Sequence, residues 1–114
     1  MSIAIRAQFE EVRRILFGAI SGTFAGIGTS FEHPVRMLII QNLTDDIMTF
    51  SHDGFTDHFD LAAGATLIMD MSSNKTIPQG FFFAEGSRMY VRQYDGAPTT
   101  GFVSMSVVYG TTGL

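Results

Sequence analysis

The chain has 114 residues and no cysteine, so it is long enough for one domain with its own buried core, and it excludes a disulfide scaffold and thiolate metal sites. Its net charge of −4, with only seven lysines and arginines, argues against the broad cationic surface that nucleic-acid binding requires. Charged residues make up 16% of the chain and apolar residues 46%, so we expect other chains to cover part of its apolar surface.

The first 14 residues, MSIAIRAQFEEVRR, contain two acids, three arginines and no long apolar stretch. This composition predicts neither a signal peptide nor a membrane span. We therefore expect the protein to be made and used in the cytoplasm, or to leave it by a route other than a cleaved signal, and not to insert into a membrane.

Within residues 1–14, apolar residues recur at helical spacing, which predicts a short amphipathic N-terminal helix or arm. The spacing runs through Ile5, Phe9 and Val12 and continues to Leu16. Such a segment packs either on its own domain or on a neighbouring subunit. In the second arrangement, the predicted interface residues are Ile3, Ile5 and Phe9.

After Phe17 the helical spacing ends, because glycines follow at positions 18, 22, 26 and 28. Each glycine disfavours a helix by about 1 kcal/mol relative to alanine. We therefore predict two strands that are bent or bulged at glycines, Ile15–Ile20 and Thr23–Phe31.

Three short apolar segments in the middle of the chain predict consecutive antiparallel strands that form a meander. They are Val35–Leu43, Ile47–Ser51 and Ala65–Met71. The polar residues Thr44–Asp46 separate the first two segments, and a polar loop that begins at His52 precedes the third.

The segment Ser72–Gly80 is rich in turn-forming residues and predicts an exposed loop. Further strands are expected at Phe81–Ala84, Arg88–Tyr94 and Phe102–Tyr109. About eight strands with turn residues between them are typical of an all-β protein. We predict an antiparallel β-sandwich over residues 15–114, with a jelly roll as the first choice. An immunoglobulin-like sandwich is the second choice, although the chain lacks the Cys and Trp that mark that fold.

The densest polar cluster is His52–Asp60, which contains two histidines and three aspartates. Imidazole and carboxylate groups suit zinc, so His52 and His58 are candidate ligands in a metal-dependent, cupin-like enzyme. These histidines match no zinc motif, and a polar loop is the preferred interpretation. A calcium site from Thr44–Asp46 and Asp53 lacks the EF-hand pattern, so ordinary turns are preferred there as well.

We predict no catalytic residue, cofactor or metal site. The chain has no Gly-x-Ser-x-Gly elbow, and its glycine-rich residues 22–28 lack the Lys-Ser/Thr ending of a phosphate-binding loop. His33 precedes Pro34 and is interpreted as a strand-end residue rather than a general base.

Several aromatic residues offer a surface on which sugars or partner chains can pack: Phe81–Phe83, Tyr90 and Tyr94. Strand alternation places Phe81 and Phe83 on one face and Phe82 on the other, so core packing is favoured for at least one face. The alternative function is a carbohydrate-binding module whose loops, His52–Asp60 and Tyr90–Thr100, contact a glycan.

Three stretches carry a resemblance that covers the chain from about Arg13 to Gly110. They are ILFGAISGTFAGIGTSFEHPVRMLIIQNLTDDIMTFSHDGFTDHF, the Asp-Met-Ser-Ser-Asn turn, and GFFFAEGSRMYVRQYDGAPTTG with the strand after it. This pattern resembles the small virion structural proteins of tailed bacteriophages. The resemblance implies a β-sandwich that assembles in many copies, as capsid cement or decoration, or as a head-tail or tail component. It implies further that the partners are other copies and other virion proteins, and that the protein is located in the virion.

Overall fold

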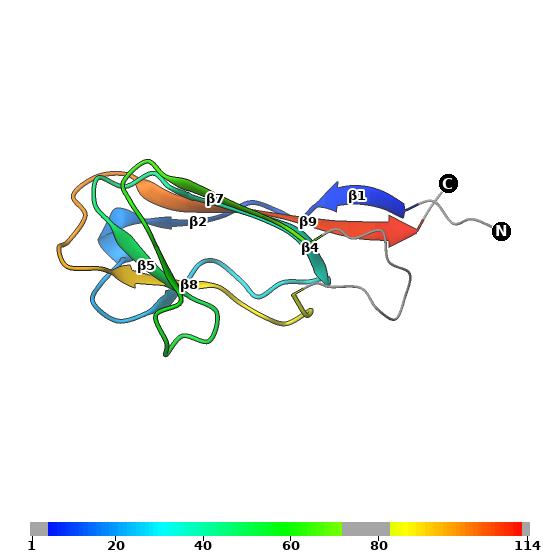
Figure 1. The fold of residues 1–114 in the computed structure, drawn as a ribbon, viewed down its shortest axis with the longest axis horizontal. Coiled ribbons are helices and arrows are strands. Elements are labelled where there is room, and N and C mark those ends of the chain that lie inside the picture. The colour runs from blue at the N-terminus through cyan, green and yellow to red at the C-terminus, as the bar shows by residue number, and fades with distance from the viewer. Residues whose placement is uncertain (1–4, 72–82, 113–114) are drawn as a thin grey trace.

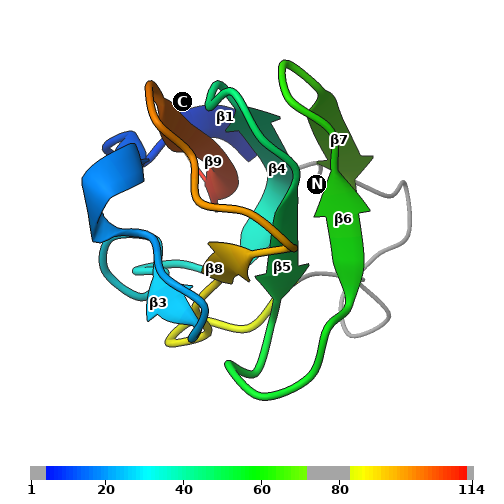
Figure 2. The same ribbon diagram turned by 90° about the vertical axis from the view of Figure 1, so that its left-hand side faces the viewer.

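A computed structural model describes residues 5–71 and 83–112, which form two antiparallel sheets packed face to face (Figures 1 and 2). The all-β sandwich predicted from the sequence is confirmed. A single turn of 3₁₀ helix, η1 (Phe17–Ala19), interrupts the strands. The strands are β1 (Ile5–Phe9), β2 (Arg13–Leu16), β3 (Ala25–Gly26), β4 (Val35–Asn42), β5 (Met48–Ser51), β6 (Phe59–Leu61), β7 (Thr66–Asp70), β8 (Tyr90–Gln93) and β9 (Phe102–Thr112).

The strand order is that of a jelly roll. One sheet has the order β1-β9-β4-β7, and β2 also pairs with β9, so β1 and β2 share one position at its edge. The other sheet has the order β3-β8-β5-β6. From β2 to β9 the chain passes repeatedly between the sheets, which gives the two interleaved Greek keys of the predicted fold.

The predicted meander is wrong, because β4 and β5 lie in different sheets. β4 pairs with β7 and β9, whereas β5 pairs with β6 and β8. The buried Asn42 makes the corner between them: its side-chain amide donates hydrogen bonds to the carbonyl oxygens of Asp46, Leu61 and Ala62. These bonds direct the chain across the core instead of back along β4.

The predicted N-terminal helix is also wrong over the described part of residues 1–14. The chain there forms β1 and the start of β2, and the expected boundary after Arg14 falls inside β2. The physical reason is that β9 is 11 residues long and offers backbone partners to both segments. A short helix with one apolar face competes poorly with such a ladder.

The structure confirms the predicted strands with apolar runs and corrects those in glycine-rich or polar stretches. The predictions that match β4, β5, β7, β8 and β9 are confirmed. The predicted strand Ile15–Ile20 overlaps β2 only at Ile15 and Leu16, because η1 follows at Phe17, and the predicted strand Thr23–Phe31 is reduced to β3. β6 was missed because its sequence lies in a polar stretch. Of the predicted strand Phe81–Ala84, Phe83 forms an isolated bridge with Val35. Phe81, Phe82 and the predicted loop Ser72–Gly80 lie outside the described residues.

The core lies between the two sheets and is built by side chains at alternating strand positions. β9 and β4 supply its upper layer, and β5 and β8 supply its lower layer (Figure 1). The fully buried residues include Leu38, Ile40, Phe50, Val91, Val103, Met105 and Val107. Burying each large apolar side chain contributes roughly 1.5–3 kcal/mol to the free energy of folding.

The molecule is elongated, with principal extents of 54 × 24 × 20 Å, because β1 and the end of β9 project beyond the sandwich (Figure 1). The pairing of β4 with β9 stops at Val35 and Tyr109, whereas β1 continues along β9 to Thr112. The projecting part is therefore a two-stranded ribbon within the described residues.

Two glycines with left-handed backbone test how tightly the loops are packed. Gly101 has φ +87° and Gly64 has φ +80°, and a Cβ at Gly101 overlaps the carbonyl oxygen of Leu43 whereas one at Gly64 meets open space. Both alanine variants should lose about 1 kcal/mol through backbone strain, and Gly101→Ala should lose clearly more through the overlap. Urea unfolding of both variants measures the difference, and equal losses would contradict the described packing.

Candidate assembly surface

The two sheets present different outer faces. On the sheet β3-β8-β5-β6, the polar side chains that point away from the core bind one another. The Thr49 hydroxyl donates to the Asp60 carboxylate over 2.7 Å, and the Arg92 guanidinium forms an ion pair with Asp57 over 2.6 Å. This face is covered by its own polar network, as expected for the solvent side of a sandwich.

The outer face of the other sheet carries exposed apolar residues on both sides of a polar row, which is formed by Arg14, Ser104, Gln41 and Thr66. Cross-strand register places Phe9 beside Val108, Val108 beside Met37, and Ile39 beside Ile68. We call this surface the apolar outer face and define it by residues of β1, β2, β4, β7 and β9: Phe9, Leu16, Met37, Ile39, Ile68, Phe102 and Val108. The exposed fractions of Phe9, Leu16 and Ile68 are 70%, 64% and 63%.

Such a face is a candidate site of association. The largest apolar patch on a protein surface is often functional, and apolar patches rimmed by polar residues mark sites of contact with other proteins. Arg14 and Asp70 share this side and lie at its two edges, and Arg6 and Arg36 line a pocket beside Met37 and Val108. The surface is therefore suited to contact with another protein chain.

The predicted interface residues have different outcomes. Phe9 lies on the apolar outer face, Ile5 lies in β1, and Ile3 lies outside the described residues. Sequence reasoning missed Leu16, Ile39 and Ile68. The signal for Ile39 was present, because Met37–Ile40 is apolar at four consecutive positions and so supplies apolar side chains to both sides of the strand.

A second feature is the buried carboxylate of Glu10, between β1 and β2. It accepts hydrogen bonds from the Arg13 guanidinium over 2.7 Å and from the backbone N–H of Glu32 over 3.1 Å, and His33 Nδ1 lies 2.8 Å away. Burial raises the pKa of Glu10, but the hydrogen bonds from His33, Arg13 and Glu32 lower it by more, so the pKa lies below its ordinary value. His33, interpreted as a strand-end residue, also stacks on Tyr109 with ring centroids 3.6 Å apart.

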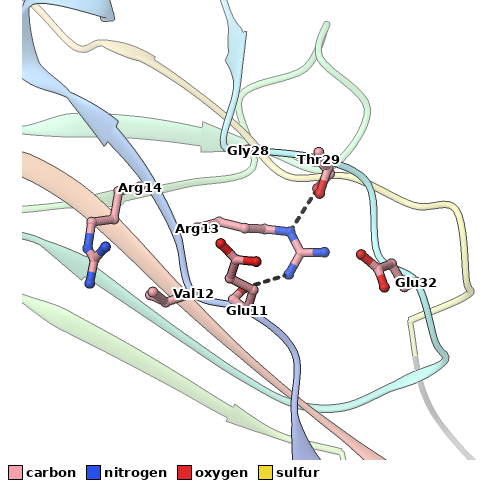
Figure 3. A pocket seen from close by; sticks show the side chains of 7 residues that line it. All are labelled: Glu11, Val12, Arg13, Arg14, Gly28, Thr29 and Glu32. Carbon is pink, nitrogen blue, oxygen red and sulfur yellow. Dashed lines mark hydrogen bonds between the residues drawn. The ribbon is translucent and has the colours of Figure 1, made fainter.

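Arg13 connects this carboxylate to the segment before β4. Its guanidinium donates to the carbonyl oxygens of Thr29 and Ser30 over 2.8 and 2.9 Å and lies 5.5 Å from the centroid of Phe31. A pocket of about 380 Å³ opens beside it, and Figure 3 shows Arg13 reaching toward Thr29 while Arg14 points away. The lining contains two glutamates, Glu11 and Glu32, and two arginines, of which Arg13 is already paired with Glu10.

The loop His52–Asp60 has the structure of a polar turn. The Asp53 carboxylate accepts hydrogen bonds from the backbone N–H groups of Phe55 and Thr56, and these bonds lower its pKa. The backbone N–H of His52 donates to His58 Nδ1 over 2.9 Å. Over residues 5–71 and 83–112, no three His, Cys, Asp or Glu side chains come together in a way that fits a metal ion.

The other predicted ligand groups are also separated. Asp45 and Asp46 precede β5 whereas Asp53 follows it, so the residues proposed for calcium lie at opposite ends of that strand. Asp45 instead accepts hydrogen bonds from Thr99. Of the two tyrosines proposed for a glycan, Tyr90 packs its ring against Gly54 and Tyr94 is 52% exposed.

Comparison with known proteins assigns no family to this chain. No protein-family model matches it, and no curated protein matches it. A solved structure of Bacillus endospore appendages, described as a novel family of disulfide-linked pili, is similar at 14% identity, with 96% of this chain and 90% of that chain covered and a TM-score of 0.46. Within the described residues, no helix is long and apolar enough to cross a membrane.

The Glu10 cluster yields a pH-dependent prediction. Glu10→Gln should lower the free energy of unfolding at neutral pH by about 1–3 kcal/mol, because the buried Arg13 loses its anionic partner. The folded-state pKa of Glu10 lies below the ordinary value of 4.5, so its contribution is present above that pH and is lost as the pH falls through the lower folded-state value. The free energies of unfolding of wild type and variant should therefore become equal in acid.

The matched control is Glu11→Gln, because the side chain of Glu11 is exposed and forms no ion pair with a described residue. Denaturant titrations of the three proteins across the acidic range measure the effect. If Glu11→Gln destabilises the protein as much as Glu10→Gln, the buried carboxylate is not the stabilising group.

Proposed function

We propose that this chain is a non-enzymatic structural subunit that assembles in multiple copies as a component of a tailed-bacteriophage virion. The proposed positions are capsid cement or decoration, or a head-tail or tail component. Its proposed partners are other copies of itself and other virion proteins. The single observation that supports assembly is the apolar outer face, and the assignment to a virion depends on the sequence resemblance.

The dimensions of this face fit a subunit that makes several contacts. With strands about 4.8 Å apart and a rise of about 3.3 Å per residue, a sheet face that is four strand positions wide and as long as the eight residues of β4 has an area on the order of 500 Å². A stable pairwise interface buries about 800 Å² on each partner. One such face therefore gives a weak contact. In an assembly of many copies, several weak contacts together are sufficient to hold each subunit in place.

The exposed side chains on this face supply the driving force. Complete burial of Phe9, Leu16 or Ile68 contributes about 1.5–3 kcal/mol for each residue. The titratable clusters of the described residues are hydrogen-bonded within turns and strand contacts, which agrees with a structural role.

A charge on the apolar outer face should dissociate the assembly. Phe9→Asp, Leu16→Asp and Ile68→Asp place a carboxylate at exposed positions, so each variant should remain folded while its solution mass falls. Light scattering over a range of concentrations measures the mass. Wild type should give a mass above that of one chain.

The matched control is Tyr94→Asp, which changes an exposed aromatic residue away from this face. Its mass should equal that of wild type. If the three face variants also keep the wild-type mass, the apolar outer face is not the assembly surface. A wild type that stays monomeric at every concentration contradicts self-assembly itself.

A further inference from the structure

The loop between β5 and β6 presents one aromatic side chain to solvent. Phe55 is 89% exposed, which is the largest exposed fraction among the described large apolar residues. It lies in the turn closed by the Asp53 carboxylate, which accepts the N–H of Phe55 over 2.8 Å and the Ser51 hydroxyl over 2.8 Å. The Ser51 oxygen also accepts the N–H of Gly54 over 2.9 Å.

These bonds fix the backbone that carries the ring. An exposed aromatic residue on a preorganised loop loses little conformational entropy when it binds. Little of the free energy gained by burying its ring is therefore lost to ordering the loop. Aromatic anchors of this kind insert into pockets at the centres of protein interfaces. Phe55 therefore has the properties of a knob.

A matching socket lies near the start of the projecting ribbon, beside the apolar outer face. It has a volume of about 220 Å³, and its lining includes Ala7, Met37, Val108 and Gly110 together with Arg6 and Arg36. An apolar cavity of about 150 Å³ is sufficient to bind benzene. The socket therefore has room for a phenyl ring.

The charges around the knob and the socket are complementary. Asp53, Asp57 and Asp60 lie within five residues of Phe55, and Arg92 pairs with Asp57, so the loop keeps an excess of negative charge. Arg6 and Arg36 form no ion pair with any residue in the described part of the chain. The loop with its aspartates and the socket with its arginines therefore attract each other.

One chain cannot fill its own socket. The loop joins β5 and β6 of the sheet β3-β8-β5-β6 (Figure 2), whereas the socket is lined by residues of β1, β4 and β9 in the opposite sheet. We propose that Phe55 of one copy inserts into the Arg6–Arg36 socket of the next copy, which deepens the proposed assembly function and depends on it. Knob and socket are different surfaces, so the contact is head-to-tail and leads to a ring or a filament.

The test uses two complementary variants. Phe55→Ala removes the knob and leaves the socket intact, whereas Arg6→Glu/Arg36→Glu reverses the charge of the socket and leaves the knob intact. Each variant alone should dissociate, with the dissociation constant raised at least about tenfold. An equimolar mixture should form a dimer that grows no further, because it contains one working knob and one working socket. Tyr94→Ala, an exposed aromatic control, should assemble as wild type does.

A second measurement uses the absence of cysteine from the chain. Phe55→Cys and Ala7→Cys proteins, mixed and oxidised, should form a disulfide-linked dimer, and the double variant should form a covalent ladder. The control pair, Tyr94→Cys with Ala7→Cys, should stay uncrosslinked. This readout does not require the substituted side chains to keep the assembly strong.

The outcomes separate the two proposals. If the mixture forms no dimer, or if Phe55→Ala keeps the wild-type mass while Phe9→Asp dissociates, the knob contact is overturned and assembly through the apolar outer face stands. If wild type is monomeric at every concentration, both proposals are overturned. Circular dichroism of each variant verifies that it is folded.

Discussion

The backbone ladder of β9 is the interaction on which the rest of the structure depends. This one strand pairs with β1, β2 and β4, so within the described residues only β7 of its sheet lacks a direct bond to it. Its alternating side chains face the core on one side and the apolar outer face on the other. The core and the proposed assembly surface are therefore the two sides of the same strand, and a change of register in β9 would exchange them.

The interruption between β1 and β2 is where side chains replace strand pairing. The backbone N–H of Glu10 still donates to the carbonyl of Val107, but its carboxylate turns inward and is neutralised by Arg13. The same pair, three residues apart, resembles a helix-stabilising pair in the sequence. Its actual role is to connect the first sheet to the segment that leads into β4.

The sequence was sufficient to predict the jelly roll and most long strands, because apolar runs bounded by turn residues are strong local signals. It could not show which sheet each run joins: Leu38 and Phe50 face the same core from opposite sheets, and alternation alone does not distinguish them. The helical spacing of Ile5, Phe9 and Val12 was overridden by the partners available on β9. Of the apolar outer face, Phe9 was predicted, whereas the socket joins residues from three strands that only the fold brings together.

The projecting ribbon gives the molecule an uneven distribution of stability. Its last pairs, from Ala7 with Gly110 to Ile5 with Thr112, belong to an element that is two-stranded among the described residues and pairs with no other described strand. Isolated hairpin-like ribbons are marginal in water, so this end opens by local unfolding at a free energy well below that of global unfolding. Amide protons there exchange early while those of Val103 and Met105 stay protected. The first strand of the chain can thus detach without the loss of the core.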